Sequence, residues 1–267
     1  MPSPRERSLP TRQAKAEALR LARRRFAGLL GPQIELREGV QSIALLSGRH
    51  VIVIPKQPNL VEAAREAALL RTMGGRVGGV AVPHLLDHDA TSGALAMTRL
   101  PGQPLRDQIP SLSRAELTHI GNRLGAFLRG FHGLSRGTDW IAAECSRFGT
   151  SPHCEAFRGQ RRVWAHHDLH SENVLYDRNS GEVGVIDFTG SGAGWAEEDF
   201  FKLDCFPTAV QTACFSAYNR KKEVPVQTRT IRDYALARDA QATRNGTQID
   251  PTFWIPPCDP LFARITA

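Results

Sequence analysis

The sequence lacks any long hydrophobic run. No apolar segment of the 267-residue chain approaches the ~18 residues that a membrane-spanning helix needs. The N-terminus also lacks the apolar stretch of a secretory signal. The five cysteines are scattered and form no C-x-x-C pair, which argues against a disulfide framework or a cysteine-bound zinc site. These absences favour a globular protein of a reducing, cytoplasmic compartment.

Acidic residues are scarce at the N-terminus. Residues 1–30 contain eight basic residues against Glu6 and Glu17, so this segment holds most of the formal net charge of +7. The rest of the chain is nearly neutral, so nucleic-acid binding is not expected. Apolar residues recur at spacings of three and four over 12–30, which predicts a basic helix. Two alternatives stay open: the helix packs on the next domain, or it binds a membrane surface or a partner protein.

The next seventy residues predict a small sheet with one helix. Residues 34–57 alternate between apolar and polar side chains, which predicts two or three antiparallel strands with turns at Gly39 and Gly48. A helix is expected over "NLVEAAREAALLRTM", followed by a flexible break at "GGRVGGV". "AVPHLLDHDATSGALAMTRL" predicts a second hairpin. The expected buried stripe of the helix is Leu60, Ala63 or Ala64, Ala67 and Leu70.

Helices dominate the second half of the chain. After a turn and linker at "PGQPL", residues 113–134 show helical periodicity, and Ser113 with Glu116 predicts a capping box at their start. Residues 135–162 show no regular pattern. "NVLYD" and "EVGVIDF", joined by "RNSG", predict a hairpin. Further helices are predicted over Glu197–Asn219 and Gln227–Arg244.

The stretch "AHHDLHSEN" concentrates polar chemistry. His166 and His170 are four residues apart, a spacing that would suit a zinc pair on a helix. The stretch leads directly into the predicted hairpin, however, so it is expected to be a loop. The hairpin would bring Asn173 at its start beside Asp187 at its end, close to Asp168. Carboxylate and amide oxygens are ligands that suit magnesium.

The block "HHDLHSEN" followed by "VGVIDF" resembles the catalytic loop and metal-binding aspartate of kinase-like phosphotransferases. The branch it most resembles is that of the aminoglycoside phosphotransferases and choline kinases. "REAALLRTM", "AMTRLPGQPL", "GAFLRGFHGL" and "GWAEEDFFKLD" resemble further segments of the family in the same order, over about residues 38–205. The resemblance implies an α+β, bilobal protein-kinase-like fold. Its parts would be a basic arm (1–30), a small antiparallel-sheet N-lobe with one inserted helix (31–101) and a mainly helical C-lobe (102–267).

The resemblance also implies ATP and Mg²⁺ as cofactors and a role for each matching residue. Asp168 would orient and deprotonate the acceptor hydroxyl, as phosphoryl transfer requires. Asn173 and Asp187 would hold magnesium on the nucleotide phosphates. His166 and Asp199 would support the catalytic loop. The nucleotide-binding residues of the N-lobe would be Lys56, Glu66, Met97 and Leu100.

Two positions depart from the family pattern. His167 stands where the family loop usually has glycine, and Val53 stands where the third strand often has lysine or arginine. Lys56 is the nearest basic candidate to pair with Glu66. These departures leave open an inactive nucleotide-binding pseudokinase.

The acceptor is expected to be a small molecule. Only twelve positions separate Asp187 from Asp199, and no A-P-E-like anchor follows, so the long activation segment of protein kinases is missing. The implied reaction is transfer of the γ-phosphate of ATP to a hydroxyl of a small molecule such as an aminoglycoside-type antibiotic. The basic arm leaves open an effector-like enzyme that acts on a protein.

Overall fold

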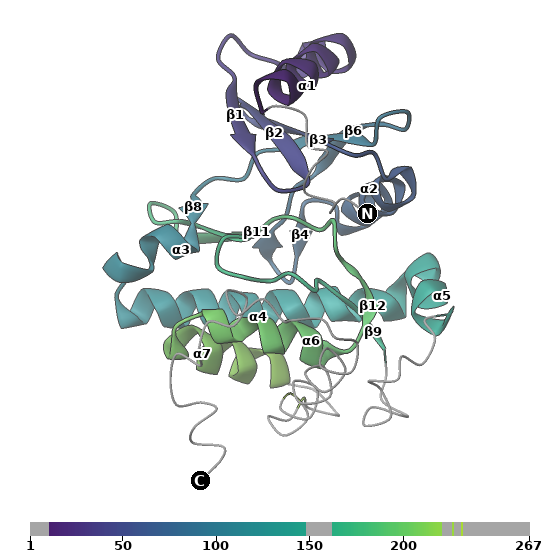
Figure 1. The fold of residues 1–267 in the computed structure, drawn as a ribbon. Helices are drawn as coiled ribbons and strands as arrows, with labels where there is room; N and C mark the ends of the chain where they lie inside the picture. Colours follow the sequence, from purple (N-terminus) through teal and green to yellow (C-terminus); the bar gives the residue numbers. More distant parts are fainter. Residues whose placement is uncertain (1–10, 148–161, 221–225, 227–230, 232–267) are drawn as a thin grey trace, which may run out of the picture. The chain divides into compact units, whose positions relative to one another are not determined.

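The computed structural model describes residues 11–147, 162–220, 226 and 231, and the chain forms two compact units (Figure 1). The first unit comprises residues 1–75 and 82–100, and the second comprises 76–81 and 101–267. The main boundary lies close to the expected one. The segment 76–81, which was expected in the N-lobe, belongs to the second unit instead.

An antiparallel sheet of five strands is the centre of the first unit, in the order β1-β2-β3-β7-β6. Both predicted hairpin regions are confirmed. The turn between β2 and β3 contains Gly48 at φ +55°, and Gly39 donates its N–H to the Ser42 carbonyl at 2.9 Å in the turn before β2. The strands are β1 (Glu35–Glu38), β2 (Ser42–Ser47), β3 (His50–Pro55), β6 (Leu85–Asp89) and β7 (Ala94–Thr98).

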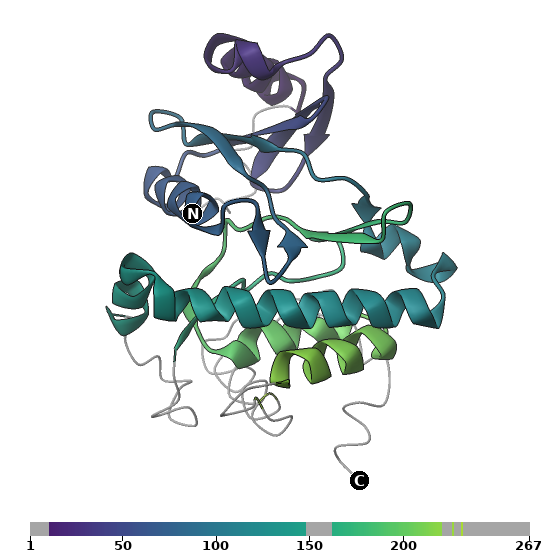
Figure 2. The ribbon, with the colours of Figure 1, turned by 180° about the vertical axis from the view of Figure 1, so that it is seen from behind.

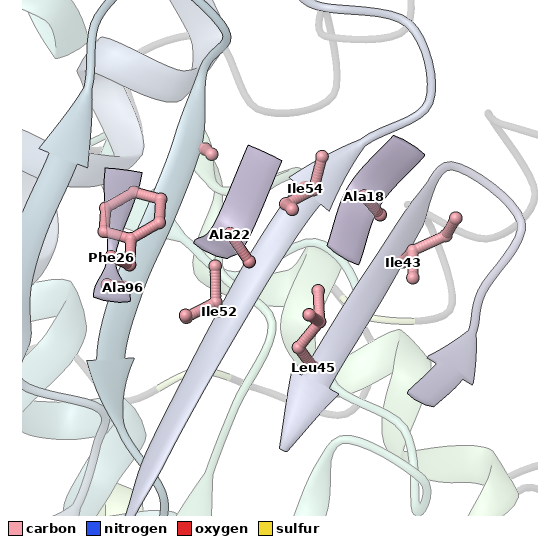
Figure 3. Packing of buried hydrophobic residues seen from close by; sticks show 9 residues of the cluster. Ala18, Ala22, Phe26, Ile43, Leu45, Ile52, Ile54 and Ala96 are labelled. Carbon is pink, nitrogen blue, oxygen red and sulfur yellow. The ribbon is translucent and has the colours of Figure 1, made fainter. Parts of the chain in front are cut away.

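Helix α1 (Thr11–Arg25) packs on one face of this sheet (Figure 3). Ala18 and Ala22 of α1, with Phe26 just after it, are spaced by four and therefore lie on one side of the helix. The apolar face of the basic helix is thus buried against the sheet, as predicted by the alternative in which the helix packs on the next domain. The helix and the short 3₁₀ turn Ala27–Leu29 pack against the sheet residues Ile43, Leu45, Ile52, Ile54, Ala94 and Ala96.

Helix α2 (Leu60–Met73) begins at the N-cap Asn59 and ends at Gly74, which has φ +59°. The expected buried stripe is wrong at Leu60, which is 44% exposed. Leu60 is the first residue of the helix, where no preceding turn covers its side chain. The buried residues of the helix are Ala63, Ala67, Leu69, Leu70 and Met73.

The stretch "GGRVGGV" is a tight hairpin, and the expected flexible break is wrong. Strands β4 (Arg76–Val77) and β5 (Val80–Ala81) pair antiparallel across Gly78 and Gly79, which have φ +57° and +80°. Such φ values suit a two-residue hairpin turn and favour glycine. A Cβ on Gly78 would lie 2.2 Å from the carbonyl oxygen of Ala126, so the glycine also permits close contact with another backbone.

The second unit combines two sheets, ordered β4-β5-β11-β10-β8 and β12-β9, with a set of helices. The predicted hairpin is confirmed, with Val174 opposite Val185. The other strands and helices have the following bounds: β8 (Gln103–Pro104), β9 (Val163–Ala165), β10 (Val174–Asp177), β11 (Glu182–Val185), β12 (Gly192–Gly194), α3 (Leu105–Gln108), α4 (Arg114–Gly137), α5 (Asp139–Arg147), α6 (Ala196–Phe201) and α7 (Thr208–Asn219). Short 3₁₀ helices span Ile109–Ser111 and Lys202–Cys205.

Three helix predictions for the second unit have different outcomes. The capping box of Ser113 and Glu116 is confirmed at the start of α4. The expectation of irregular structure is wrong over 135–147, where α4 continues and α5 follows. The helix expected over 227–244 lies outside the described residues, apart from Ile231.

Helices α4 and α7 lie side by side (Figure 2), with glycine at their contact. A Cβ on Gly121 would lie 2.4 Å from the Val210 carbonyl oxygen, and a Cβ on Gly125 would lie 2.3 Å from that of Cys214. The two backbones therefore approach as closely as they do only because both side chains are hydrogen. Within the described part of the chain, no helix combines the length and the apolar character needed to cross a membrane.

Candidate active site

The stretch from His166 to Asn173 is a loop between β9 and β10, as expected, so the helical spacing of a zinc pair does not arise. Both ends of the loop are tied to the residue that follows β11. The Ile186 N–H donates to the Asn173 carbonyl at 2.9 Å, and the His166 Nε2 lies 3.3 Å from the Ile186 carbonyl. Across residues 11–147 and 162–220, no three His, Cys, Asp or Glu side chains gather as a metal site.

His166 is a buried, neutral support of the loop. Its imidazole lies among Phe127, Phe131 and Phe188, with ring centroids 4.9 to 6.5 Å away. Burial lowers its pKa and outweighs the nearby carboxylates that would raise it. The Nε2 faces a carbonyl and the Nδ1 lies 3.4 Å from the Asp168 N–H, an arrangement that suits one neutral tautomer.

Asp199 on α6 joins the loop to the helices. Its side chain is fully buried and accepts the N–H of His166 at 2.8 Å and that of His167 at 2.7 Å. His132 of α4 lies 2.9 Å away through Nε2, while its Nδ1 faces the Tyr218 hydroxyl of α7 at 2.8 Å. Burial acts to raise the pKa of Asp199, but the bond from His132 and the nearby imidazoles outweigh it and lower the pKa. The carboxylate therefore stays ionised inside a completed network.

His167 has a left-handed backbone conformation, with φ +65°. Glycine adopts this conformation freely, whereas a residue with a side chain is strained in it. The imidazole Nδ1 lies 2.5 Å from the carboxylate of Glu198. Burial acts to lower the pKa of His167, but the hydrogen bond to Glu198 outweighs it and raises the pKa. Gly194 makes room for this pair, because a Cβ there would lie 2.7 Å from both side chains.

Asp168 is a partly exposed carboxylate of the loop, with 42% of its side chain accessible. His170 Nε2 lies 3.3 Å from one of its oxygens, and Lys202 Nζ lies 3.5 Å from the other. The hydrogen bond from His170, followed by the charge and hydrogen bond of Lys202, lowers its pKa to about 2. Asp168 is therefore a carboxylate at neutral pH and can accept a hydrogen bond from a hydroxyl group.

Asn173 lies beside this carboxylate, and Asp187 follows Ile186, whose N–H pairs with the Asn173 carbonyl. The Asn173 amide nitrogen donates to the Asp168 carbonyl at 2.9 Å and to its side chain at 3.2 Å, which leaves the amide oxygen as an acceptor. Asp187 is exposed and has φ +65°, two residues after the end of β11. One amide oxygen and one carboxylate fit magnesium, which takes few protein ligands and keeps several waters.

The expected nucleotide-binding residues Lys56, Glu66, Met97 and Leu100 all lie in the first unit. Lys56 follows β3 directly, and its ammonium group is 2.9 Å from a carboxylate oxygen of Glu38. That bond lowers the pKa of Glu38. Val53 lies within β3, opposite Ala44 and Leu95 of the neighbouring strands. Met97 is buried on β7, and Leu100 is partly buried after it.

Four residues of the site were not assigned a role from the sequence. Lys202 and His170 contact the Asp168 carboxylate, Glu198 contacts His167, and His132 contacts Asp199. His170 lies inside the recognised block, so its spacing could have indicated a role. The other three also lie in segments that resemble the family, but their contacts involve helices distant in sequence from the loop, so the sequence offered no reason to assign them a role.

Comparisons with known proteins identify the family and the fold. The family model APH, described as "Phosphotransferase enzyme family", matches residues 46–150 and 147–235. No curated protein matches the chain. Solved structures do match the chain, including the following three.

The first is the streptomycin–ATP ternary complex of APH(2'')-IIa, with 15% identity over 86% of this chain and 88% of the other, and a TM-score of 0.59. The second is the GDP complex of wild-type aminoglycoside 2'-phosphotransferase-IIIa, with 16% identity over 88% and 93% and a TM-score of 0.63. The third is macrolide 2'-phosphotransferase MphH from Brachybacterium faecium, with 20% identity over 93% and 100% and a TM-score of 0.58. These likenesses confirm the expected kinase-like α+β fold.

Proposed function

This chain belongs to the Phosphotransferase enzyme family, and we propose that it transfers the γ-phosphate of ATP to a hydroxyl group of a small molecule. The surroundings of Asp168 are the observation that carries this proposal. The Asp168 side chain is an ionised, partly exposed carboxylate that His170 and Lys202 contact. The backbone just before it is fixed by two hydrogen bonds to Asp199. Phosphoryl transfer asks a protein mainly for positioning and charge neutralisation, which this arrangement supplies.

In the proposed reaction, Asp168 accepts a hydrogen bond from the acceptor hydroxyl. This bond directs the hydroxyl oxygen at the γ-phosphorus of ATP. The bond from that oxygen to phosphorus forms as the bond to the β-phosphate oxygen breaks, and the proton passes to Asp168. A carboxylate with a pKa of about 2 is a weak base, so its main role is orientation, and it takes the proton late. The Lys202 ammonium group would offset negative charge beside the transferred phosphoryl group.

Asn173 and Asp187 would hold Mg²⁺, which neutralises phosphate charge when it is bound. Their oxygen donors fit that ion better than they fit zinc, which prefers nitrogen and sulfur. Lys56, Glu66, Met97 and Leu100 are the residues of the first unit that we assign to nucleotide binding. The ion pair of Lys56 with Glu38 would have to open, or be joined by phosphate, for this lysine to act.

The acceptor class is proposed from the similar solved structures. These include complexes with streptomycin, gentamicin and kanamycin and a macrolide phosphotransferase, which supports a polyhydroxylated antibiotic as the acceptor. The described cysteines Cys145, Cys205 and Cys214 are not in disulfide bonds, which fits a reaction in a reducing compartment such as the cytoplasm. The basic face of α1 is compatible with a membrane surface or a protein partner, but the opposite face packs on the sheet. Substitution of exposed arginines such as Arg23 and Arg24, rather than deletion of the helix, would therefore test that role without removing core residues.

A labelled-phosphate screen tests the proposal. The full chain would be incubated with Mg²⁺, γ-labelled ATP and a panel holding these aminoglycosides, a macrolide, and a general protein substrate. We expect labelled product with at least one small molecule and none with Asp168→Asn or Asp187→Asn. Label on the protein substrate alone would favour the effector-like alternative. No nucleotide binding and no transfer to any acceptor would refute the proposal, and binding without transfer would favour an inactive module.

A further inference from the structure

His167 and Glu198 form the contact that sets this chain's loop apart from the family pattern. The imidazole occupies the position beside Asp168 at which the family usually has glycine, and it ends 2.5 Å from the Glu198 carboxylate. Neither residue is part of the proposed chemistry. The question is what the pair does for the loop.

The backbone at His167 gives a first part of the answer. A left-handed φ of +65° is strained for a residue with a side chain and unstrained for glycine. Such a conformation persists only where the surroundings fix it. Here the His167 N–H is held by Asp199 and its side chain is held by Glu198, the adjacent residue on α6.

The space around the pair gives a second part. Gly194 of β12 has no side chain at the one place where a Cβ would strike both the imidazole and the carboxylate at 2.7 Å. Glu198 is 11% exposed and His167 is 29% exposed in their side chains, so the contact is partly shielded from water. Electrostatic attraction and hydrogen bonding are stronger under such shielding than at the open surface.

We propose that His167 and Glu198 are a positioning pair that holds the backbone of Asp168 in its reactive orientation. The pair replaces the conformational freedom of a glycine with a side-chain tether to α6. Each member then depends on the other: without Glu198 the strain at His167 is no longer offset, and without His167 a shielded carboxylate loses its partner. The inference rests on the proposed function only for its effect on turnover.

A double-mutant cycle tests this dependence. The four proteins are the wild type, His167→Gly, Glu198→Ala and the variant with both changes. The first readout is hydrogen exchange of the loop between β9 and β10. We expect each single variant to exchange at least fivefold faster than the wild type, and the double variant to return to within about twofold of it. Glu182→Ala is the control, because it breaks an ion pair with Arg76 elsewhere in the second unit.

The second readout is turnover with the acceptor that the labelled-phosphate screen identifies. We expect kcat to fall about tenfold in each single variant and to recover in the double variant, with KM for ATP unchanged throughout. A purely structural role would change stability without this split between kcat and KM. Equal exchange in all four proteins, or effects that multiply in the double variant, would overturn the proposal. Because exchange needs no substrate, this result is independent of a failure of the proposed function.

Discussion

Replacement of Asp199 by asparagine isolates the contribution of one buried charge. The carboxylate accepts three hydrogen bonds, from the N–H groups of His166 and His167 and from the His132 imidazole, at 2.7 to 2.9 Å. An asparagine can present its oxygen to only one side. With that oxygen facing His166 and His132, its NH₂ group faces the His167 N–H, so two donors oppose each other.

The expected destabilisation follows from these contacts. One hydrogen bond to a charged acceptor is lost, at about 1.5–3 kcal/mol, and one buried N–H is left unsatisfied, at about 1–3 kcal/mol. We therefore expect Asp199→Asn to lower the free energy of unfolding by about 2.5–6 kcal/mol. That is a large part of the ~5–15 kcal/mol typical of a folded protein, but it leaves the chain folded at low temperature.

Urea unfolding followed by tryptophan fluorescence measures this change, since Trp164 is buried on β9 next to the loop. The matched control is Asp107→Asn, which removes the charge of an exposed carboxylate 3.5 Å from Arg106. A surface pair of that kind contributes at most about 1 kcal/mol. If Asp199→Asn unfolds within about 1 kcal/mol of the wild type, the network around Asp199 does not support the loop as argued.

Three further predictions concern other contacts of the second unit. Gly125→Ala places a Cβ 2.3 Å from the α7 backbone and should lower stability in thermal unfolding by about 1–3 kcal/mol, whereas Gly133→Ala on the same helix meets no atom within 4 Å and should leave stability equal or higher. Lys202→Met should lower kcat at least tenfold with an unchanged KM for ATP, and Lys202→Arg should restore part of it, because the cation beside Asp168 is then kept. Bonds from the N-cap serine lower the pKa of Glu116 from 4.5 to about 2, so its contribution to stability is complete above pH 4.5 and is lost as the pH falls toward 2. Unfolding midpoints of Glu116→Gln measured over that range should therefore fall less steeply than those of the wild type.

Local signals in the sequence explain most of what could be predicted. The capping box of Ser113 and Glu116 and the hairpin that ends before Asp187 depend on residues a few positions apart, and both are present. The stretch "GGRVGGV" shows the limit of such signals. Glycine pairs are compatible with a flexible break and with a tight turn, and the choice depends on a backbone contact with Ala126, nearly fifty positions away.

The same limit applies to the site. The loop could be located because its residues are contiguous, and Asn173 and Asp187 because a hairpin connects them. The contacts of Asp168 with Lys202 and of His167 with Glu198 join residues more than thirty positions apart. Only the packing of α6 and the 3₁₀ helix after it against the loop creates them, so no spacing rule could have indicated them.

Backbone strain in this protein is concentrated where the chemistry is proposed. Among the described residues, His167 and Asp187 are the two non-glycine residues with positive φ. They lie beside Asp168 and after β11, in the two segments that carry the expected catalytic and metal-binding groups. Each conformation costs of the order of 1 kcal/mol or more, and the surrounding hydrogen bonds must supply that energy. The strain is offset at His167 by Asp199 and Glu198, two adjacent residues of α6 that have no need of substrate to act. In the proposed reaction, the orientation of Asp168 would therefore be fixed before an acceptor binds, and binding energy would not be spent on arranging the loop.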